Sequence, residues 1–472
     1  MEFATNQKNH NQELNNIMRH KGTGTKIGER IGDPDGEEQK QIIATFFRTI
    51  KYYFGKTGVL FTGIKDQREE WKITYPLEAL LFTGVMLFIF QLGSRRQVNY
   101  RLRGNKTAEK KYKALFGVED IPHGDTLNYA YRQLHVEEVQ EVVCRMAEKL
   151  MKCAEMEQWR LFGIYYLIAI DGTGIVSFKE RHCPYCLSRK LRNGEICYYH
   201  PVLEAKWVTG NGYAISIMTE FIENTDPEAS KQDCELKAFY RLAERLKKRF
   251  GEIPFCLLLD GLFAGGPTLE HCEKKDWKYL IGLSDDDLPG INQEFEGLLS
   301  LPPQTQHTVQ LTYKVNQTYR WVNGLEYVDS NEKRHTVNVL ECVENSGGQS
   351  NKFKWLTNFT LLSTNSPSIA NQAGRLRWKI ENEGFNLQKR GGFCLEHAFS
   401  RHENAHKVFY LLLQVALTLF QLMSKSSTFK QAFPAGVGSL KNMAYRLLEA
   451  WRNLRLDEQD FLTLIELPIN SS

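Results

Sequence analysis

The chain has 472 residues, of which 42% are hydrophobic and 25% are charged. This composition is ordinary for a soluble globular protein and excludes a collagen-like, coiled-coil or wholly disordered chain. The 60 Lys and Arg residues against 56 Asp and Glu residues give a formal net charge of +4. Because that excess is too small to indicate a nucleic-acid partner by itself, any such surface must come from local clustering of charge.

The sequence favours a protein that stays inside the cell. No stretch reaches the roughly 18 consecutive apolar residues of a membrane span, and the polar N-terminus lacks the apolar core of a secretory signal. We therefore expect a cytoplasmic protein with no membrane partner. The ten cysteines are then expected to be reduced thiols, or metal ligands where their spacing is tight.

The first third of the chain divides into an arm and a helical region. Residues 1–40 are rich in Asn, Gln, Lys, Gly and Asp and poor in apolar residues, which predicts a disordered polar and basic arm. From 41 to 155 apolar residues recur at intervals of three and four, which predicts a helical domain. We interpret this region as the candidate DNA-binding domain.

One segment of the helical region, 95–113, carries eight basic residues and one acidic residue, Glu109. Clustered Lys and Arg side chains neutralise DNA phosphates and release counterions, so they are candidate phosphate contacts. A solvated loop and helix face would have the same composition. The candidate contacts are Arg95, Arg96, Arg101, Arg103, Lys110 and Lys111, and Lys106 and Lys113 complete the cluster.

Beyond residue 155, apolar strands alternate with amphipathic helices, which predicts an α/β domain with helices packed on a sheet. Short strands and the hairpin signal Asn323-Gly324 interrupt this pattern. The expected parts are 156–288 and 351–425 for the two halves of the α/β domain, 289–350 for an all-β insertion, and 426–472 for a C-terminal helical segment.

Two aspartates directly follow fully apolar strands. Asp171 follows Tyr165–Ile170 and Asp260 follows Phe255–Leu259, and a glycine comes next in both cases. Charged residues at the ends of buried strands lie at the rim of a sheet, where open α/β folds bind ligands. Two ionised carboxylates repel each other there unless a cation lies between them, and oxygen ligands favour Mg²⁺ or Mn²⁺. A turn or capping role is the alternative for either residue alone.

A third acidic group lies on a helix that we expect to run from Ser366 to Lys389. Arg377 and Glu381 are four residues apart and share one face of that helix. In this placement Glu381 faces the two aspartates and Arg377 meets a phosphate, while Lys389 lies about 80° away and reaches another phosphate. Glu383 is the alternative third carboxylate. A surface helix of mixed charge would give the same pattern.

Three motifs together resemble the DDE transposases of bacterial insertion sequences. They are AIDGTG around Asp171, LLLDGLFAGGP around Asp260 and RWKIENEGFNLQKRGG around Glu381, and the resemblance runs over roughly 127–423. It implies an RNase H-like mixed sheet flanked by helices, with an inserted all-β subdomain and a helical N-terminal domain. It also implies that these three carboxylates hold the catalytic metal ions and that Arg377 is the family's helical arginine.

The sequence departs from the family pattern at two positions of this helix. Gly374 stands where many members have tyrosine, and Gln388 stands where a lysine is usual, with Lys389 directly after it. These departures concern the auxiliary phosphate contacts more than the acidic residues.

The resemblance also implies a reaction and its partners. Water and then the freed 3′-hydroxyl would attack phosphorus in line, an exchange that suits two metal ions held by carboxylates. The DNA partners would be the terminal inverted repeats of a mobile element and its target. By family analogy the protein would act as a homodimer on DNA, in the bacterial cytoplasm at the nucleoid.

A second metal site is predicted close to the first aspartate. Cys183, Cys186, Cys197 and His200 have the spacing C-x2-C-x10-C-x2-H, which suits a tetrahedral Zn²⁺ site. His182 is the alternative to His200 as the fourth ligand. A closed four-ligand site would be structural, and a cysteine-rich loop without metal is the other interpretation.

Two other functions are compatible with these features. A zinc-stabilised DNA-binding protein derived from a transposase would bind DNA without cutting it. A metal-dependent phosphohydrolase of small substrates would act without DNA and would not need the basic segment. Metal-dependent cleavage of DNA distinguishes the three hypotheses.

Overall fold

A computed structural model describes residues 34–55, 57–225, 231–301, 306–312 and 315–466. The described residues from 39 to 466 form one compact unit. Of the predicted arm, residues 1–33 lie outside the described residues. Residues 34–40, expected to belong to that arm, are instead helical and begin α2 (Pro34–Phe54).

The region before the sheet is built of helices, and its most buried one is α3 (Leu77–Ile89), which is apolar around its whole circumference. At Gly84 of α3 a side chain would overlap the hydroxyl of Tyr131, so glycine allows α3 and α6 to approach closely. The other helices are α4 (Arg95–Arg101), α5 (Lys106–Phe116), α6 (Gly124–Gln133) and α7 (Val136–Met151), with 3₁₀ turns η1 (Thr57–Phe61), η2 (Glu70–Lys72) and η3 (Ala154–Trp159).

A mixed sheet forms the centre of the molecule, and its order in the first half is β4-β3-β1-β5-β6. β1, β5 and β6 are parallel, and β3 and β4 add antiparallel strands at one side. This is the order of an RNase H-like sheet, so the predicted fold class is confirmed. The strands are β1 (Tyr166–Phe178), β2 (Leu187–Lys190), β3 (Ile196–Val208), β4 (Ala214–Phe221), β5 (Phe255–Leu259) and β6 (Lys278–Gly282). The connections include α8 (Glu235–Phe250), η4 (Gly261–Phe263) and α9 (Gly266–Lys274).

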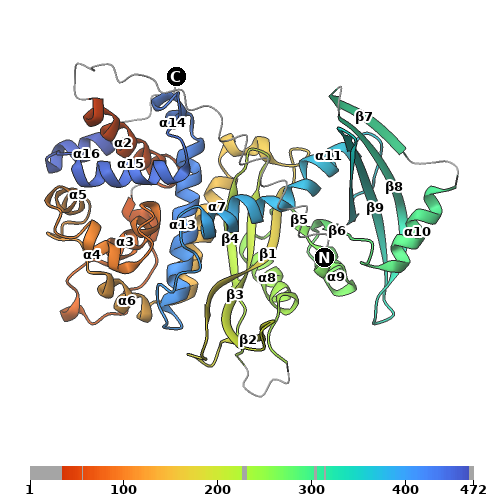
Figure 1. Ribbon diagram of the computed structural model, residues 1–472, viewed down its shortest axis with the longest axis horizontal. Coiled ribbons are helices and arrows are strands. Elements are labelled where there is room, and N and C mark those ends of the chain that lie inside the picture. The colour runs from red at the N-terminus through yellow and green to blue at the C-terminus, as the bar shows by residue number, and fades with distance from the viewer. Residues whose placement is uncertain (1–33, 56, 226–230, 302–305, 313–314, 467–472) are drawn as a thin grey trace. The chain divides into compact units, whose positions relative to one another are not determined.

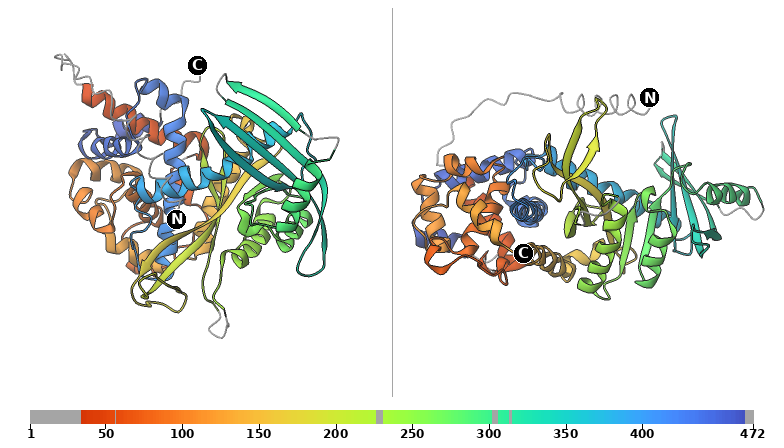
Figure 2. Two further views of the ribbon diagram at one scale, coloured as in Figure 1. Left: turned by 45° about the vertical axis from the view of Figure 1, so that its right-hand side comes forward. Right: turned by 90° about the horizontal axis from the view of Figure 1, so that it is seen from below.

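The inserted strands extend this same sheet, because β10 pairs with β6 and the order continues β10-β9-β8-β7. In Figure 1 they form the end of the sheet that lies farthest from helices α3–α6. Figure 2 shows the same arrangement in two further views. The strands are β7 (Gln306–Thr312), β8 (Val315–Val328), β9 (Arg334–Ser346) and β10 (Gln349–Thr357).

Two expectations for this insertion are wrong. The segment is not all-β, since it begins with the helix α10 (Pro289–Leu299). Asn323-Gly324 is not a hairpin turn either, because it lies inside β8, where the pairing with β9 shifts between Val322 and Leu325. Gly324 has a positive φ of 79°, a conformation that glycine adopts readily, and it forms part of a β-bulge instead of a turn.

The predicted long helix from Ser366 to Lys389 is divided into four pieces. They are α11 (Ser366–Gln372), η5 (Gly374–Trp378), the π-helical turn η6 (Ile380–Phe385) and α12 (Asn386–Arg390). The helix breaks at Ala373, whose φ of −131° is not helical. Next to it, a side chain at Gly374 would overlap the Trp355 ring, so the glycine allows close packing at the break.

Helix α13 (Ala405–Lys425) packs against α3, α6 and α7 on one side and β4 on the other (Figure 1). Among the described helices it is long and apolar enough to cross a membrane, but 89% of its apolar window is buried inside the protein. The central helix of a folded core has the same properties. Three shorter helices follow, α14 (Ser427–Ala432), α15 (Leu440–Asn453) and α16 (Glu458–Glu466).

Candidate active site and metal centre

Asp171 lies within β1, directly after the buried run that ends at Ile170. The strand continues through the aspartate to Phe178, so Asp171 does not end it as expected. Its Oδ1 accepts a hydrogen bond of 2.8 Å from the backbone N–H of Gly172. Burial raises the pKa of Asp171 to about 6, and the negative charges of Asp260 and Glu381 act in the same direction. The three carboxylates are therefore close enough to influence one another.

Asp260 follows β5 and caps the short helix η4, because its Oδ1 accepts from the N–H of Leu262 at 3.1 Å. β5 runs parallel to β1, with Leu258 paired to Ala169. Asp171 and Asp260 each follow this pair by two residues, so the parallel register places them at the same level of neighbouring strands. Asp260 can therefore cap η4 and also belong to the group of carboxylates around Asp171.

Glu381 lies on the π-helical turn η6, a feature that is frequent at functional sites. Its neighbour Glu383 is engaged elsewhere, in an ion pair of 2.5 Å with Lys379. Of the two glutamates, Glu381 is the one whose charge contributes to the raised pKa of Asp171. The oxygens of Asp171, Asp260 and Glu381 do not all lie within 4.8 Å of one another in the described structure.

Arg377 belongs to the 3₁₀ turn η5 and lies against the first aspartate. Its Nη1 is 3.6 Å from Asp171 Oδ2, and its guanidinium stacks on the ring of Trp378. The positive charge of Arg377 opposes the burial that raises the pKa of Asp171. Lys389 lines a hollow of about 460 Å³ together with Glu381 and Arg189, and its Nζ lies 3.7 Å from Glu396.

A buried polar network, which the sequence analysis missed, holds the helix that carries Glu381. Gln388 is fully buried and donates to Gln414 of α13 at 2.7 Å, and Lys206 of β3 donates to the same oxygen at 2.6 Å. Gln388 therefore faces the core and not a phosphate, in agreement with its departure from the family's lysine. Lys206 also lies 3.5 Å from Glu204, which accepts from Tyr410 at 2.8 Å.

A fourth carboxylate lies beside the site and was also missed. Glu235, the first residue of α8, packs on Gly172 so closely that a side chain at position 172 would overlap it. Burial raises the pKa of Glu235, and the charges of Asp171 and Asp260 add to the effect. No motif in the sequence around Glu235 indicated that it would lie beside the two aspartates.

Two of the basic residues in segment 95–113 stabilise the fold through contacts with backbone carbonyls. Lys111 is 1% exposed and donates to the backbone oxygens of Trp451 and Leu454, and burial lowers its pKa to about 7. The structure thus contradicts Lys111 as a DNA contact, because its amine cannot reach solvent. Arg95 is half-buried, with its guanidinium on the carbonyl of Phe399 at 2.6 Å.

The other basic side chains of this segment are more accessible. Arg103 is exposed and pairs with Asp120 at 3.1 Å. Arg96, Arg101 and Lys110 are exposed and form no ion pair with another described residue. Among the described residues of segment 95–113, these three side chains can therefore contact a phosphate without breaking an ion pair.

A compact group of sulfur and nitrogen atoms lies at the start of the β2–β3 hairpin. Sγ of Cys183 and Sγ of Cys186 are 3.4 Å apart, and His200 Nε2 is 3.4 Å and 3.3 Å from them. His182 Nδ1 completes the group at 3.2 Å from Cys186 Sγ. The donor atoms of these four residues lie within 4.8 Å of one another. Burial lowers the pKa of His200 to about 4, so its ring is neutral, as a metal ligand must be.

Cys197 is not part of this group, and this differs from the expected ligand set. Cys197 and His200 both lie in β3, three residues apart. Successive side chains of a strand point to opposite faces, so residues at i and i+3 diverge. His182 takes the place of Cys197, although the sequence offered it only in place of His200.

Comparisons with known proteins do not assign a family. No protein-family model matches the chain, and no curated protein matches it. A solved structure that it resembles is that of piggyBac transposase in a synaptic complex with hairpin DNA, with a TM-score of 0.38 and 10% sequence identity. The similarity covers 93% of this chain and 84% of that chain. Similarity at this level does not assign a function to the chain.

Proposed function

We propose that this protein is a DDE transposase of a bacterial insertion sequence, which cuts the ends of its element and joins them to target DNA. What supports the proposal is that the charges of Asp260 and Glu381 both act on Asp171, with Asp171 and Asp260 on the neighbouring parallel strands of an RNase H-like sheet or directly after them. Burial and mutual repulsion raise the pKa of Asp171, and a binding site for divalent cations requires such a concentration of negative charge.

The donor set fits Mg²⁺ or Mn²⁺, because all three side chains offer hard carboxylate oxygens. When bound, such ions stabilise the charge that develops on the attacking and leaving oxygens of a phosphodiester. The chain's own contribution is to hold the phosphate. Arg377 lies at the first aspartate and Lys389 in the adjoining hollow, where their positive charges complement phosphate oxygens.

In the proposed reaction, water attacks the phosphorus at the element end and forms a new P–O bond as the bond to the 3′-oxygen breaks. The freed 3′-hydroxyl then attacks a target phosphorus in the same site, where it forms a new P–O bond as the bond to the 3′-oxygen of the target strand breaks and that oxygen leaves as a 3′-hydroxyl. The exposed Arg96, Arg101 and Lys110 would contact the terminal repeats. We expect the protein to work in the cytoplasm at the nucleoid, as a homodimer that brings two element ends together.

The first experiment uses a plasmid that carries the gene with its natural flanking DNA, incubated with purified protein and Mg²⁺. We expect nicks at the element ends that require the metal, and their loss in Asp171→Asn, Asp260→Asn and Glu381→Gln. Glu383→Gln is the matched control and should keep its activity, since Glu383 pairs with Lys379. Nicking that survives substitution of both aspartates would refute the proposal. DNA binding without nicking would favour the non-catalytic alternative.

The proposal includes a structural Zn²⁺ ion held by His182, Cys183, Cys186 and His200. Two thiolates and two imidazoles suit zinc, and the interatomic distances of 3.2–3.4 Å are those of atoms that share one centre. A closed set of four ligands leaves no position for substrate, so the site would stabilise the hairpin next to Asp171 and take no part in the chemistry.

A further inference from the structure

His200 has a second ring nitrogen that the zinc group does not use. Its Nε2 lies against the two cysteine sulfurs, while its Nδ1 points to the other side and has no hydrogen-bond partner within the described part of the chain. The residue is 2% exposed. A buried N–H without a partner costs roughly 1–3 kcal/mol.

Two further unpartnered atoms lie in the same place. One ligand atom from each of His200, Glu223 and His406 lies within 4.8 Å of the others. Glu223 Oε1 and His406 Nε2 are both buried without a hydrogen-bond partner among the described residues. The rings of His200 and His406 are close, with their centroids 4.7 Å apart.

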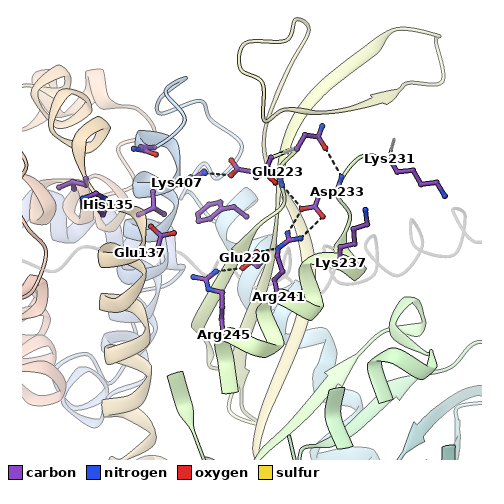
Figure 3. A pocket seen from close by; sticks show the side chains of 16 residues that line it. His135, Glu137, Glu220, Glu223, Lys231, Asp233, Lys237, Arg241, Arg245 and Lys407 are labelled. Carbon is purple, nitrogen blue, oxygen red and sulfur yellow. Dashed lines mark hydrogen bonds and ion pairs between the residues drawn. The ribbon is translucent and has the colours of Figure 1, made fainter. Parts of the chain in front are cut away.

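The other hydrogen bonds of His406 and Glu223 determine whether each unpartnered atom is a donor or an acceptor. His406 Nδ1 lies 3.0 Å from the carbonyl oxygen of His402, and a carbonyl only accepts, so Nδ1 carries the proton and Nε2 is an acceptor. Glu223 Oε2 accepts from Lys407 Nζ at 2.6 Å, which leaves Oε1 as a free acceptor. Figure 3 shows Glu223 directed toward Lys407, on the opposite side from Asp233 and Arg241.

The tautomer of His200 determines whether its Nδ1 is the donor for these acceptors. A neutral imidazole that binds a metal through Nε2 must carry its proton on Nδ1. Two residues with unpartnered acceptors lie beside this ring, because ligand atoms of His200, Glu223 and His406 lie within 4.8 Å of one another, and Glu223 Oε1 and His406 Nε2 have no hydrogen-bond partner among the described residues. Metal-binding histidines almost always donate their second N–H to a carboxylate or a carbonyl, and this contact fixes the ring and makes it a stronger ligand.

We infer that Glu223 and His406 are positioning residues of the zinc site, which accept a hydrogen bond from His200 Nδ1–H when zinc is bound and hold the ring with Nε2 toward the metal. Glu223 follows β4, and His406 and Lys407 belong to the first turns of α13. The arrangement links the zinc-binding hairpin to the central helix of the core. This inference rests on the proposed zinc site and predicts that the site takes one ion.

The test measures zinc affinity of the full-length protein by competition with a chromophoric chelator, together with zinc content by mass spectrometry. We expect one zinc per chain. Affinity should fall by about 10- to 100-fold in Glu223→Ala, with a smaller loss in His406→Phe. Glu223→Gln should restore part of the affinity because its amide oxygen can still accept. Glu220→Ala is the matched control, since Glu220 pairs instead with Arg241 and Arg245.

A second readout separates positioning from general stability. In the metal-free protein, Glu223→Ala and Glu220→Ala should lower the melting temperature by similar amounts, and only Glu223→Ala should reduce the gain on adding zinc. Equal zinc affinity in Glu223→Ala and the parent would overturn the inference. So would two zinc ions per chain, because the group would then be a second cation site. Zinc retained by Cys183→Ser and Cys186→Ser would instead refute the zinc site itself.

Discussion

The guanidinium of Arg377 lies 3.6 Å from the carboxylate of Asp171, and the two residues are 206 positions apart in the chain. Burial raises the pKa of Asp171 to about 6, and Arg377 is the main group that opposes this rise. The arginine therefore helps to keep the aspartate ionised near neutral pH, which metal binding requires.

Arg377→Gln should move the pH dependence of DNA cleavage. Without the positive charge the pKa of Asp171 rises above about 6, by about one to two units for the loss of one adjacent cation. The acidic limb of kcat/KM against pH should shift upward by the same amount, measured as Mg²⁺-dependent nicking between pH 5.5 and 9. Arg375→Gln is the control because Arg375 pairs with Glu344. An unshifted limb would mean that Asp171 does not control this titration.

Asp171→Asn should inactivate the protein and stabilise it. The folded-state pKa is raised from 3.8 to about 6, so the folded protein loses stability as pH rises through this interval, and the full cost is present above it. The isosteric amide removes this cost, which predicts a gain of about 1–3 kcal/mol in the free energy of unfolding at pH 7.5. Urea denaturation in the presence of EDTA measures it. The gain should shrink at pH 4.5, and a gain that is equal at both pH values would argue against this cause.

Lys110 and Lys111 are adjacent in the sequence but should behave in opposite ways. Lys111 is buried with its amine on the last carbonyls of α15, so Lys111→Met should cost about 1–3 kcal/mol of stability. It should leave the DNA affinity of the folded protein unchanged. Lys110→Ala should leave stability unchanged and reduce the salt dependence of DNA binding by about one counterion. Fluorescence anisotropy over a range of salt, with denaturation curves for both variants, separates the two roles. Equal effects on DNA binding would contradict the assignment.

The sequence predicted the positions that follow from local pattern. The apolar runs before Asp171 and Asp260 end in charged residues, so their neighbouring positions in the sheet could be foreseen, although β1 continues past Asp171 to Phe178. The break before Arg377 could not, because it depends on the contact of Gly374 with Trp355, a residue on a distant strand. The buried Lys111 had a signal that was overlooked, since it shares the apolar face of α5 with Ala108 and Tyr112.

Secondary structure determines which of the clustered cysteines and histidines can bind the same zinc ion. The expected set treated Cys197 and His200 as one loop, whereas both lie in β3, where residues three apart point to opposite faces. We therefore expect Cys197→Ser to keep about one zinc per chain, while His182→Ala and Cys186→Ser lose it or bind it far more weakly. Zinc content after dialysis without chelators measures this, with Cys234→Ser, an exposed thiol, as the control. Loss of zinc in Cys197→Ser with retention in His182→Ala would restore the ligand set expected from the sequence and show that the hairpin pairs differently in solution.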